Sequence, residues 1–250
     1  MVVTVSFFDD TAAPEFREYR GLKHEVFVLE QGWPLPLDVD GRHVAPDPFD
    51  PHSMFVIGRV DGRAVGIARA TMIDEAFPHA DFFIELMQRP ELEDARTAVA
   101  TVNAVAVLPA FRGQPMRVNG SARSMTTAKA LMVELTRRLA REGTEVVLLT
   151  TSPGLAAVFF DHLGFYLLGP PFCSEGRTLI NMGLGVHDTD HFREIGSPLA
   201  DEGFATGASE AERRCIGYFR AQAAAALGDK SMEEFCHKEL SRAPSPTIVT

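Results

Sequence analysis

The fold is decided by residues 101–165, which read TVNAVAVLPAFRGQPMRVNGSARSMTTAKALMVELTRRLAREGTEVVLLTTSPGLAAVFFDHLGF. The apolar runs 102–107 and 146–149 predict two buried strands. Between them, leucine recurs every fourth residue, which indicates an amphipathic helix, and Gly143 gives that helix a stop. Strand, turn, helix and strand in this order predict an α/β domain with a right-handed crossover between parallel strands.

An Arg- and Gly-rich turn follows the first of these strands. Arg112-Gly113 opens it, and Arg117, Gly120 and Ala122 continue it towards the helix. Backbone N–H groups at a helix N-terminus, where the helix dipole is positive, favour a phosphate or pyrophosphate. An ordinary Gly-containing turn between a strand and a helix is the alternative interpretation.

Composition points to a globular α/β protein of one large domain. The chain has 250 residues, 46% of them hydrophobic, and a mean hydropathy of −0.00. No apolar run reaches the roughly 20 residues that span a bilayer, so no membrane partner is expected. Three scattered cysteines give neither a disulfide framework nor a metal pattern, and a cytoplasmic location is expected.

The charge is unevenly distributed along the chain. The formal net charge is −10, which argues against nucleic acid as a partner. Residues 112–141 nevertheless hold seven basic side chains and one acid. A basic patch beside a phosphate loop suits coenzyme A or an acidic carrier protein; a solvated helix face is the alternative.

The N-terminal part supplies further strands and a loop. Residues 2–8 predict a strand, and Pro14 begins a helix that should end near Gly32. A Pro-rich loop covers 34–51, and Asp61-Gly62 predicts a hairpin between two apolar runs.

The last sixty residues have a different character. Residues 188–207 are polar, Ser209 should cap a helix over 210–227, and a short helix is expected at 231–240. We therefore predict a main domain at 1–187 and a helical C-terminal extension at 188–250. That extension should pack on the main domain or on a second subunit of a homodimer.

The stretch 101–165 resembles the acyl-thioester-binding half of the GCN5-related N-acyltransferases. Arg117-x-x-Gly120-x-Ala122 matches the pyrophosphate loop of this superfamily, and Leu163-Gly164-Phe165 matches its Gly-Phe segment. The resemblance implies a mixed central sheet with flanking helices. It also implies transfer of an acyl group from a coenzyme A or carrier-protein thioester, with no permanently bound cofactor.

The first half resembles one branch, the acyl-homoserine-lactone synthases, and the related N-acyl amino acid synthases. Three pieces carry this resemblance: Phe27 with Trp33, Asp47-Pro48-Phe49-Asp50, and Gly66-Ile67-Ala68-Arg69. It implies that Trp33, Asp47, Asp50 and Arg69 bind the amine acceptor.

The sequence departs from that branch at several positions. Lys23 replaces an Arg, Ala45 replaces a Glu, and Thr101 and Ala104 replace a Glu and an Arg of the central strand. These losses weaken lactone synthesis as an interpretation and leave the broader one, an N-acyltransferase that acts by direct attack of an amine.

The resemblance also implies a catalytic set. A backbone N–H between Ala104 and Val107, at a local splay or bulge of the strand, is the expected oxyanion donor, with Val105 catalytic and Val107 binding the donor. Asn103 stands where many family members carry a catalytic carboxylate, and Phe160 stands where they carry a tyrosine acid. Asn103 could orient a water or the amine.

The remaining candidates for the missing acid–base role are Glu25, Asp47, Asp50, His52 and Arg69, of which Asp50 and Glu25 are assigned to the catalytic set. Glu25 has an exposed helix residue as its alternative interpretation. For Asp47 and Asp50, the alternative is a solvated acidic loop held by Arg42 or Arg69.

Three broader alternatives remain. The His187-x-x-x-His191 segment with its two aspartates is interpreted as a loop, and no metal site is expected. A non-catalytic protein that binds acyl thioesters is the rival function, because the usual acid and base are missing. A simple acetyltransferase is a further rival.

Overall fold

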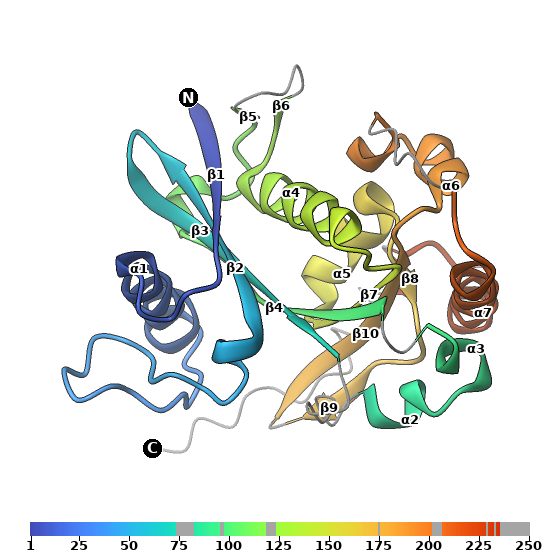
Figure 1. Ribbon diagram of the computed structural model, residues 1–250, viewed down its shortest axis with the longest axis horizontal. Coiled ribbons are helices and arrows are strands. Elements are labelled where there is room, and N and C mark those ends of the chain that lie inside the picture. Colours follow the sequence, from blue (N-terminus) through green and yellow to red (C-terminus); the bar gives the residue numbers. More distant parts are fainter. Residues whose placement is uncertain are drawn as a thin grey trace. The chain divides into compact units, whose positions relative to one another are not determined.

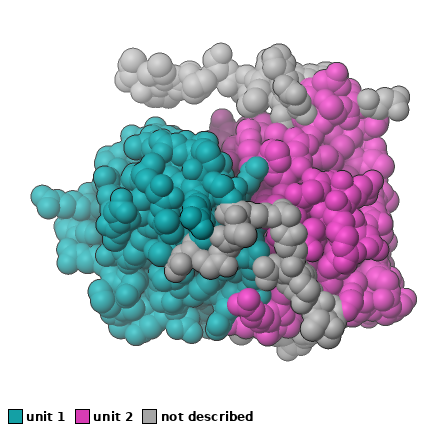
Figure 2. Space-filling view, turned by 90° about the horizontal axis from the view of Figure 1, so that it is seen from above, with its two compact units in different colours: residues 1–72, 101–139 teal, residues 73–100, 140–250 magenta. Residues whose placement is uncertain are grey.

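The computed structural model describes residues 1–73, 83–95, 98–118, 124–174, 176–201, 207–228, 230–232 and 234–235. The chain divides into two compact units, each built from both halves of the sequence. Unit 1 comprises residues 1–72 and 101–139, and unit 2 comprises 73–100 and 140–250 (Figure 2). The predicted division at residue 187 is a different partition and stays a prediction.

Unit 1 is built on a mixed sheet with the strand order β6-β5-β1-β2-β3-β4 (Figure 1). The neighbours β1 and β5 pair in parallel, whereas β1 with β2, β2 with β3 and β5 with β6 pair antiparallel. Its elements are β1 Val2–Phe8, α1 Pro14–Lys23, the π-helix η1 His24–Glu30, the 3-10 helix η2 Asp50–His52, β2 Ser53–Val60, β3 Arg63–Met72, β4 Val99–Val107, the 3-10 helix η5 Pro109–Phe111, β5 Met116–Val118, β6 Ser124–Met125 and α4 Thr127–Arg141.

The predicted hairpin is present between β2 and β3. Val60 pairs with Arg63, so Asp61 and Gly62 form a two-residue loop. Both have positive φ, 49° and 79°, as the favoured two-residue hairpin turn requires. The loop and a register shift between Gly58 and Arg59 together place Phe55 opposite Arg69.

The two faces of this sheet are covered by different helices. Phe55, Ile57 and Ile67 point to the face on which Tyr19 of α1 packs. The opposite face carries glycines, of which Gly66 is the tightest: a Cβ there would lie 2.9 Å from Leu131 of α4. These glycines therefore let α4 lie close to the strands.

The helix predicted to begin at Pro14 consists of α1, which continues directly into the π-helix η1. Gln31 N–H donates to Val26 O across five residues, at 3.2 Å. The helix ends there, and Gly32 has a positive φ of 68°. Trp33 N–H then donates to Phe27 O at 2.8 Å. The helix thus ends where the sequence predicts, although a π-helix was not expected.

The Arg/Gly segment was predicted as one turn between a strand and a helix, and the structure corrects this prediction. Met116–Val118 forms the strand β5, in which Arg117 pairs with Val2 of β1. Met116–Val118 also pairs antiparallel with β6 Ser124–Met125 at the edge of the sheet, so these described residues do not form a single turn. Gly120 and Ala122 lie outside the described residues.

Unit 2 has the strand order β7-β10-β8, with β9 also paired to β10. The predicted pairing of the final strands is confirmed by β8 and β10. Its elements are α2 Ile84–Met87, α3 Pro90–Glu93, β7 Val146–Thr151, α5 Pro153–Leu163, β8 Tyr166–Leu167, β9 Phe172–Ser174, β10 Arg177–Gly185, α6 Thr189–Glu194, the 3-10 helix η6 Pro198–Asp201 and α7 Glu210–Leu227.

The C-terminal extension packs on these strands through α7. Ser209 caps it as predicted, accepting a hydrogen bond from Glu212 N–H at 3.0 Å. A Cβ at Gly183 of β10 would lie 2.9 Å from Phe219, so the glycine permits close approach. The helix predicted at 231–240 lies mostly outside the described residues. Among the helices that the structure describes, none combines the length and apolarity that a bilayer crossing requires.

Candidate functional site

A buried arginine in β3 is the centre of the site in unit 1. Arg69 is 6% exposed, and its Nη1 lies 2.5 Å from Asp47 Oδ2 and 2.7 Å from Asp50 Oδ1. Its Nε donates to Asn103 Oδ1 at 2.5 Å. Burial opposes the charge, but the facing carboxylates outweigh burial and keep the pKa of Arg69 above its usual value. The structure thus brings four of the predicted site residues together.

The loop that carries the two aspartates is built by its own side chains. Asp47 N–H donates to Asp50 Oδ2 at 2.8 Å, and Phe49 N–H donates to Asp47 Oδ1 at 2.9 Å. The Asp50 side chain is 3% exposed, whereas that of Asp47 is 28% exposed. Only Asp47 therefore presents a carboxylate that solvent or a substrate can reach directly.

A second cation shares the Asp47 carboxylate. Lys23, the last residue of α1, places its Nζ 3.3 Å from Asp47 Oδ2. Burial and the nearby Arg69 lower the pKa of Lys23, while Arg69 and Lys23 lower that of Asp47 against the opposing effect of burial. With two cations and two carboxylates, the cluster of Lys23, Asp47, Asp50 and Arg69 is neutral in its ionised form.

The Tyr19 hydroxyl completes the buried side of this cluster. Tyr19 is 0% exposed, and its hydroxyl has no hydrogen-bond partner among the described residues. Burial raises its pKa above the usual tyrosine value, so the hydroxyl keeps its proton. Its ring lies 4.8 Å from that of Phe55, which fixes it against the sheet.

The central strand β4 is irregular where it meets Arg69. Ala104 has a positive φ of 56°, which non-glycine residues rarely adopt. Asn103 faces Arg69, and Ala104 packs with Ala106 on the same face of the sheet. Asn103 and the next residue, Ala104, therefore lie on the same face of the sheet, whereas consecutive residues of a regular strand alternate between faces. This arrangement is typical of a β-bulge. The bulge predicted between Ala104 and Val107 therefore begins at Ala104.

The bulge also marks the accessible part of the strand. Asn103, Ala104 and Val105 are half-buried, whereas every other residue of β4 is buried. Val107 is 7% exposed, and its carbonyl accepts a hydrogen bond from Arg112 Nε at 2.8 Å. The catalytic and donor-binding roles of Val105 and Val107 stay predictions.

Trp33 belongs to the aromatic cluster beside this site. Its ring lies 4.6 Å from that of Phe27, and it packs at the edge of the core that contains Tyr19 and Ala106. Trp33 thus borders the cluster from the end of the π-helix, and its predicted role in binding the acceptor stays a prediction.

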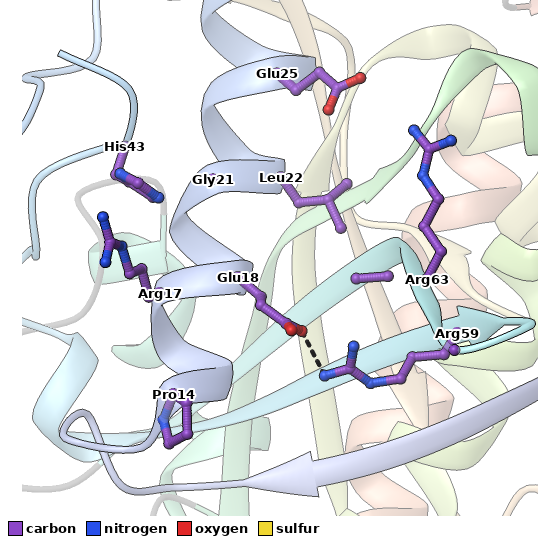
Figure 3. Close-up of a pocket in the computed structure, with 11 residues that line it drawn as sticks. Pro14, Arg17, Glu18, Gly21, Leu22, Glu25, His43, Arg59 and Arg63 are labelled. Atoms are coloured by element: carbon purple, nitrogen blue, oxygen red, sulfur yellow. Dashed lines mark ion pairs between the residues drawn. The ribbon is translucent and has the colours of Figure 1, made fainter. Parts of the chain in front are cut away.

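Glu25, a predicted catalytic residue, lies outside the Arg69 cluster. It is exposed and borders an open depression of about 620 Å³ between α1 and the β2–β3 turn, whose lining includes neither Arg69 nor Asn103. Figure 3 shows the Glu18–Arg59 ion pair, 2.5 Å long, across this depression. The placement matches the alternative interpretation of Glu25 as an exposed helix residue.

Arg112, the first basic residue of the Arg/Gly turn, forms an ion pair with Glu30. Arg112 Nη1 and Nη2 lie 2.5 and 2.6 Å from the two carboxylate oxygens of Glu30, whose pKa the arginine lowers. The side chain of Arg112 is 41% exposed, and Gly113 next to it has a positive φ of 68°. An ion pair this exposed contributes only about 0–1 kcal/mol, so an incoming phosphate can replace it.

Arg117 does not share this neighbourhood. Three strands of the unit 1 sheet separate its strand β5 from β4, and the residues directly before α4 are 124–126, not 117–122. Arg117 therefore does not stand directly before α4, and the phosphate-binding role of Arg117, Gly120 and Ala122 stays a prediction. Lys129 N–H donates to Thr126 Oγ1 at 3.4 Å, so Thr126 caps α4.

In unit 2, Phe160 lies on α5 and is half-buried, beside the fully buried Phe159. Its predicted place at the leaving sulfur stays a prediction. The side chains of His187 and His191 both contact other residues of unit 2. His187 Nδ1 lies 2.7 Å from Glu212 Oε2, and the His191 ring stacks on that of Tyr166, with 4.6 Å between the ring centroids. Nowhere in the described ranges do three or more His, Cys, Asp or Glu side chains gather as they would around a metal ion.

Comparison with known proteins gives the fold. No family model matches the sequence, and no curated protein matches it significantly. Many solved structures match, and three of them align over 98% of their own chain. They are TofI in a ternary complex with an inhibitor and MTA (18% identity, 79% of this chain, TM-score 0.58), the CoA-dependent acyl-homoserine lactone synthase BjaI with SAM and isopentyl-CoA (17%, 86%, 0.55), and the N-acyl amino acid synthase FeeM from uncultured soil microbes (14%, 80%, 0.54).

The chain has the fold of these three solved structures. The fold that the sequence predicts, a mixed sheet with flanking helices and a helical C-terminal extension, is thereby confirmed. With identities below 20%, the similarity establishes architecture, and the chemistry has to be argued from the residues.

Proposed function

We propose that the protein is an N-acyltransferase that moves an acyl group from a coenzyme A or carrier-protein thioester to an amine. The observation that carries this proposal is the buried Arg69 cluster, held directly beside the bulged and accessible part of β4. Burying the charged groups of Lys23, Asp50 and Arg69 beside a strained strand residue costs stability, and such costs are typical of functional sites. The reaction class, acyl transfer, is inferred by analogy with the solved synthases that share this fold.

Direct attack needs little covalent chemistry from the protein. The enzyme has to hold the amine near the thioester carbonyl and stabilise the charge that develops on the carbonyl oxygen. The bulge at Ala104 disrupts the local ladder, as an oxyanion donor on this strand requires. BjaI was solved with isopentyl-CoA and SAM, and FeeM is an N-acyl amino acid synthase; both support a thioester donor.

The proposed donor site predicts a loss of affinity in Arg112→Ala. One charge-assisted hydrogen bond to a phosphate contributes about 1.5–3 kcal/mol, so the donor Kd should rise roughly 10- to 100-fold. Isothermal titration with coenzyme A measures this change. The matched control is Glu30→Gln, which removes the ion-pair partner of Arg112 and should bind coenzyme A at least as well as the wild type. Unchanged affinity in Arg112→Ala contradicts the donor role.

The proposed acceptor site is tested at Asp47, the more exposed aspartate. If it contacts the acceptor amine, Asp47→Asn should raise the acceptor KM about tenfold and leave the Kd for coenzyme A unchanged. Lys23 and Arg69 already neutralise the two carboxylates, so this binding would act through a hydrogen bond and not through net charge. Wild-type KM and kcat in Asp47→Asn would leave the loop with a purely structural role.

A non-catalytic protein that binds acyl thioesters is the second candidate. The observation that favours it is the nature of residues 103 and 160, an amide and a phenyl ring where an acid–base pair would be expected. Thiol release from acetyl-, medium-chain and branched-chain acyl-CoA, measured with a panel of amines and amino acids, separates the two functions. Product formation identified by mass spectrometry supports transfer, whereas tight donor binding without release supports the second candidate.

The same panel addresses the donor and acceptor classes. A preference for acetyl-CoA would indicate a simple acetyltransferase, and activity only with acylated carrier protein would identify that partner. The predicted homodimer and cytoplasmic location stay predictions.

A further inference from the structure

Asn103 is the one polar side chain at the accessible part of β4. It is half-buried in a strand that is otherwise buried outside residues 103–105. Its neighbours along the strand, Val102, Ala104 and Val105, offer no polar side-chain atoms. Any group that approaches the bulge from this side therefore meets the Asn103 carboxamide.

The orientation of this carboxamide follows from its partner. Arg69 Nε–H can only donate, so the atom 2.5 Å away must be the oxygen of Asn103. The Nδ2 group of Asn103 then points away from Arg69 and offers N–H donors. Because a carboxamide nitrogen does not accept a proton at neutral pH, Asn103 is excluded as a general base and is suited to a carbonyl oxygen or an oxyanion.

The cation behind the carboxamide strengthens these donors. Arg69 pulls electron density towards the Asn103 oxygen, and polarised hydrogen bonds in a low-dielectric site reinforce each other. Arg69 is itself fixed by Asp47 and Asp50, so the carboxamide cannot rotate without losing its hydrogen bond from Arg69 Nε. The donor is preorganised, as charge stabilisation in a transition state requires.

We propose that the Asn103 carboxamide donates a hydrogen bond to the acyl carbonyl oxygen of the thioester and stabilises the oxyanion formed on it. The inference rests on the acyl transfer proposed above and assigns one residue a part in it. Asn103 is then a catalytic residue, and Arg69 is a positioning residue that acts through it.

The reaction step balances without a further reagent. The amine nitrogen forms a bond to the carbonyl carbon, and the carbonyl electron pair moves to the oxygen, where Asn103 Nδ2–H holds it. The pair returns, the carbon–sulfur bond breaks, and the sulfur leaves as a thiolate. The proton that the nitrogen loses passes through water to the thiolate, which gives an amide and a thiol.

The test is Asn103→Asp, which keeps the size of the side chain and an oxygen facing Arg69 but removes both N–H donors. We expect kcat to fall about 100-fold, the cost typical of losing one oxyanion donor. The Kd of an alkyl-CoA thioether, which has a CH₂ group in place of the carbonyl, should stay within twofold of the wild-type value. A residue with a merely structural role would weaken thioether binding as well.

Two further variants separate charge and folding from the donor effect. Asn103→Ala removes the donors without adding a charge and should lose kcat to a similar degree. Gln88→Glu makes the same amide-to-acid change at an exposed position of unit 2 and should retain wild-type kcat.

The outcomes distinguish the inference from the proposed function. An active wild type with equally active Asn103→Asp and Asn103→Ala variants overturns the role of Asn103 alone. Equal losses in kcat and in thioether affinity also overturn it and assign a binding role. A wild type that releases no thiol with any donor and amine overturns the proposed function and this inference together.

Discussion

Replacing Arg69 with methionine should lower the free energy of unfolding by about 3–5 kcal/mol. The substitution leaves Asp50, whose side chain is 3% exposed, without its cation and Asp47 with Lys23 alone. Removing one partner of a buried ion pair is far more costly than the pair is stabilising, because an uncompensated charge remains in a low-dielectric environment. Urea unfolding monitored by circular dichroism measures the loss.

Two variants make this expectation specific. Arg193→Met removes an exposed arginine from its ion pair with Asp190 and should cost at most about 1 kcal/mol. The triple variant Arg69→Met, Asp47→Asn, Asp50→Asn removes the stranded charges and should recover part of the stability. If Arg69→Met unfolds at the same urea concentration as Arg193→Met, the cluster does not stabilise unit 1.

The elements with a strong local signal could be predicted from the sequence. The β2–β3 hairpin followed from Asp61-Gly62, whose two residues tolerate positive φ. The start of α7 followed from Ser209 and the apolar spacing behind it. In both cases a few neighbouring residues determine the conformation, so no distant contact was needed to recognise it.

Part of the site was predictable for a different reason. Arg69 and Asn103 are polar residues within apolar strands, and such residues need partners when they are buried. Their pairing joins positions 34 residues apart, which only the paired strands bring together. Lys23 was noted merely as a departure from a related branch, yet its proximity to Asp47 makes it part of the cluster.

Two features have no local signal in the sequence, although the family resemblance led us to expect the first of them. The bulge occurs at Ala104, a residue with neither the freedom of glycine nor the constraint of proline, so no turn signal marks it. Residues 116–118 were predicted as part of a turn and form the strand β5, because a segment with Gly and Arg does not show by itself where a turn ends. The pairing of Arg117 with Val2 depends on an edge of the sheet that becomes available only after folding.

A second large effect is expected where α7 joins unit 2. Glu212 is 0% exposed, and its carboxylate accepts hydrogen bonds from His187 N–H at 2.6 Å and from His187 Nδ1 at 2.7 Å. The hydrogen bond to Glu212 raises the pKa of His187 above its usual value, although burial acts in the opposite direction. In the folded protein, His187 therefore carries its charge to a higher pH than in the unfolded chain.

The sign of the pH dependence follows from this shift. A group whose pKa is raised on folding binds its proton more tightly in the folded state. The stabilisation is fully present below the unfolded pKa of about 6.5 and is lost as the pH rises through the higher folded value. Unfolding free energies measured from pH 6 to pH 9 should therefore decrease along this series, and amide exchange in α7 should accelerate.

The variant Glu212→Gln isolates this contribution. Glutamine keeps the length of the side chain and can still accept from His187 N–H, but it loses the charge that holds the imidazolium. We expect a loss of about 1.5–3 kcal/mol at pH 6, which shrinks towards pH 9 as the wild type loses its own stabilisation. Glu210→Gln provides the control, because it makes the same change on an exposed residue of the same helix. A difference between wild type and Glu212→Gln that is constant over the whole pH range would contradict the ion pair, since a neutral hydrogen bond would stabilise α7 equally at every pH.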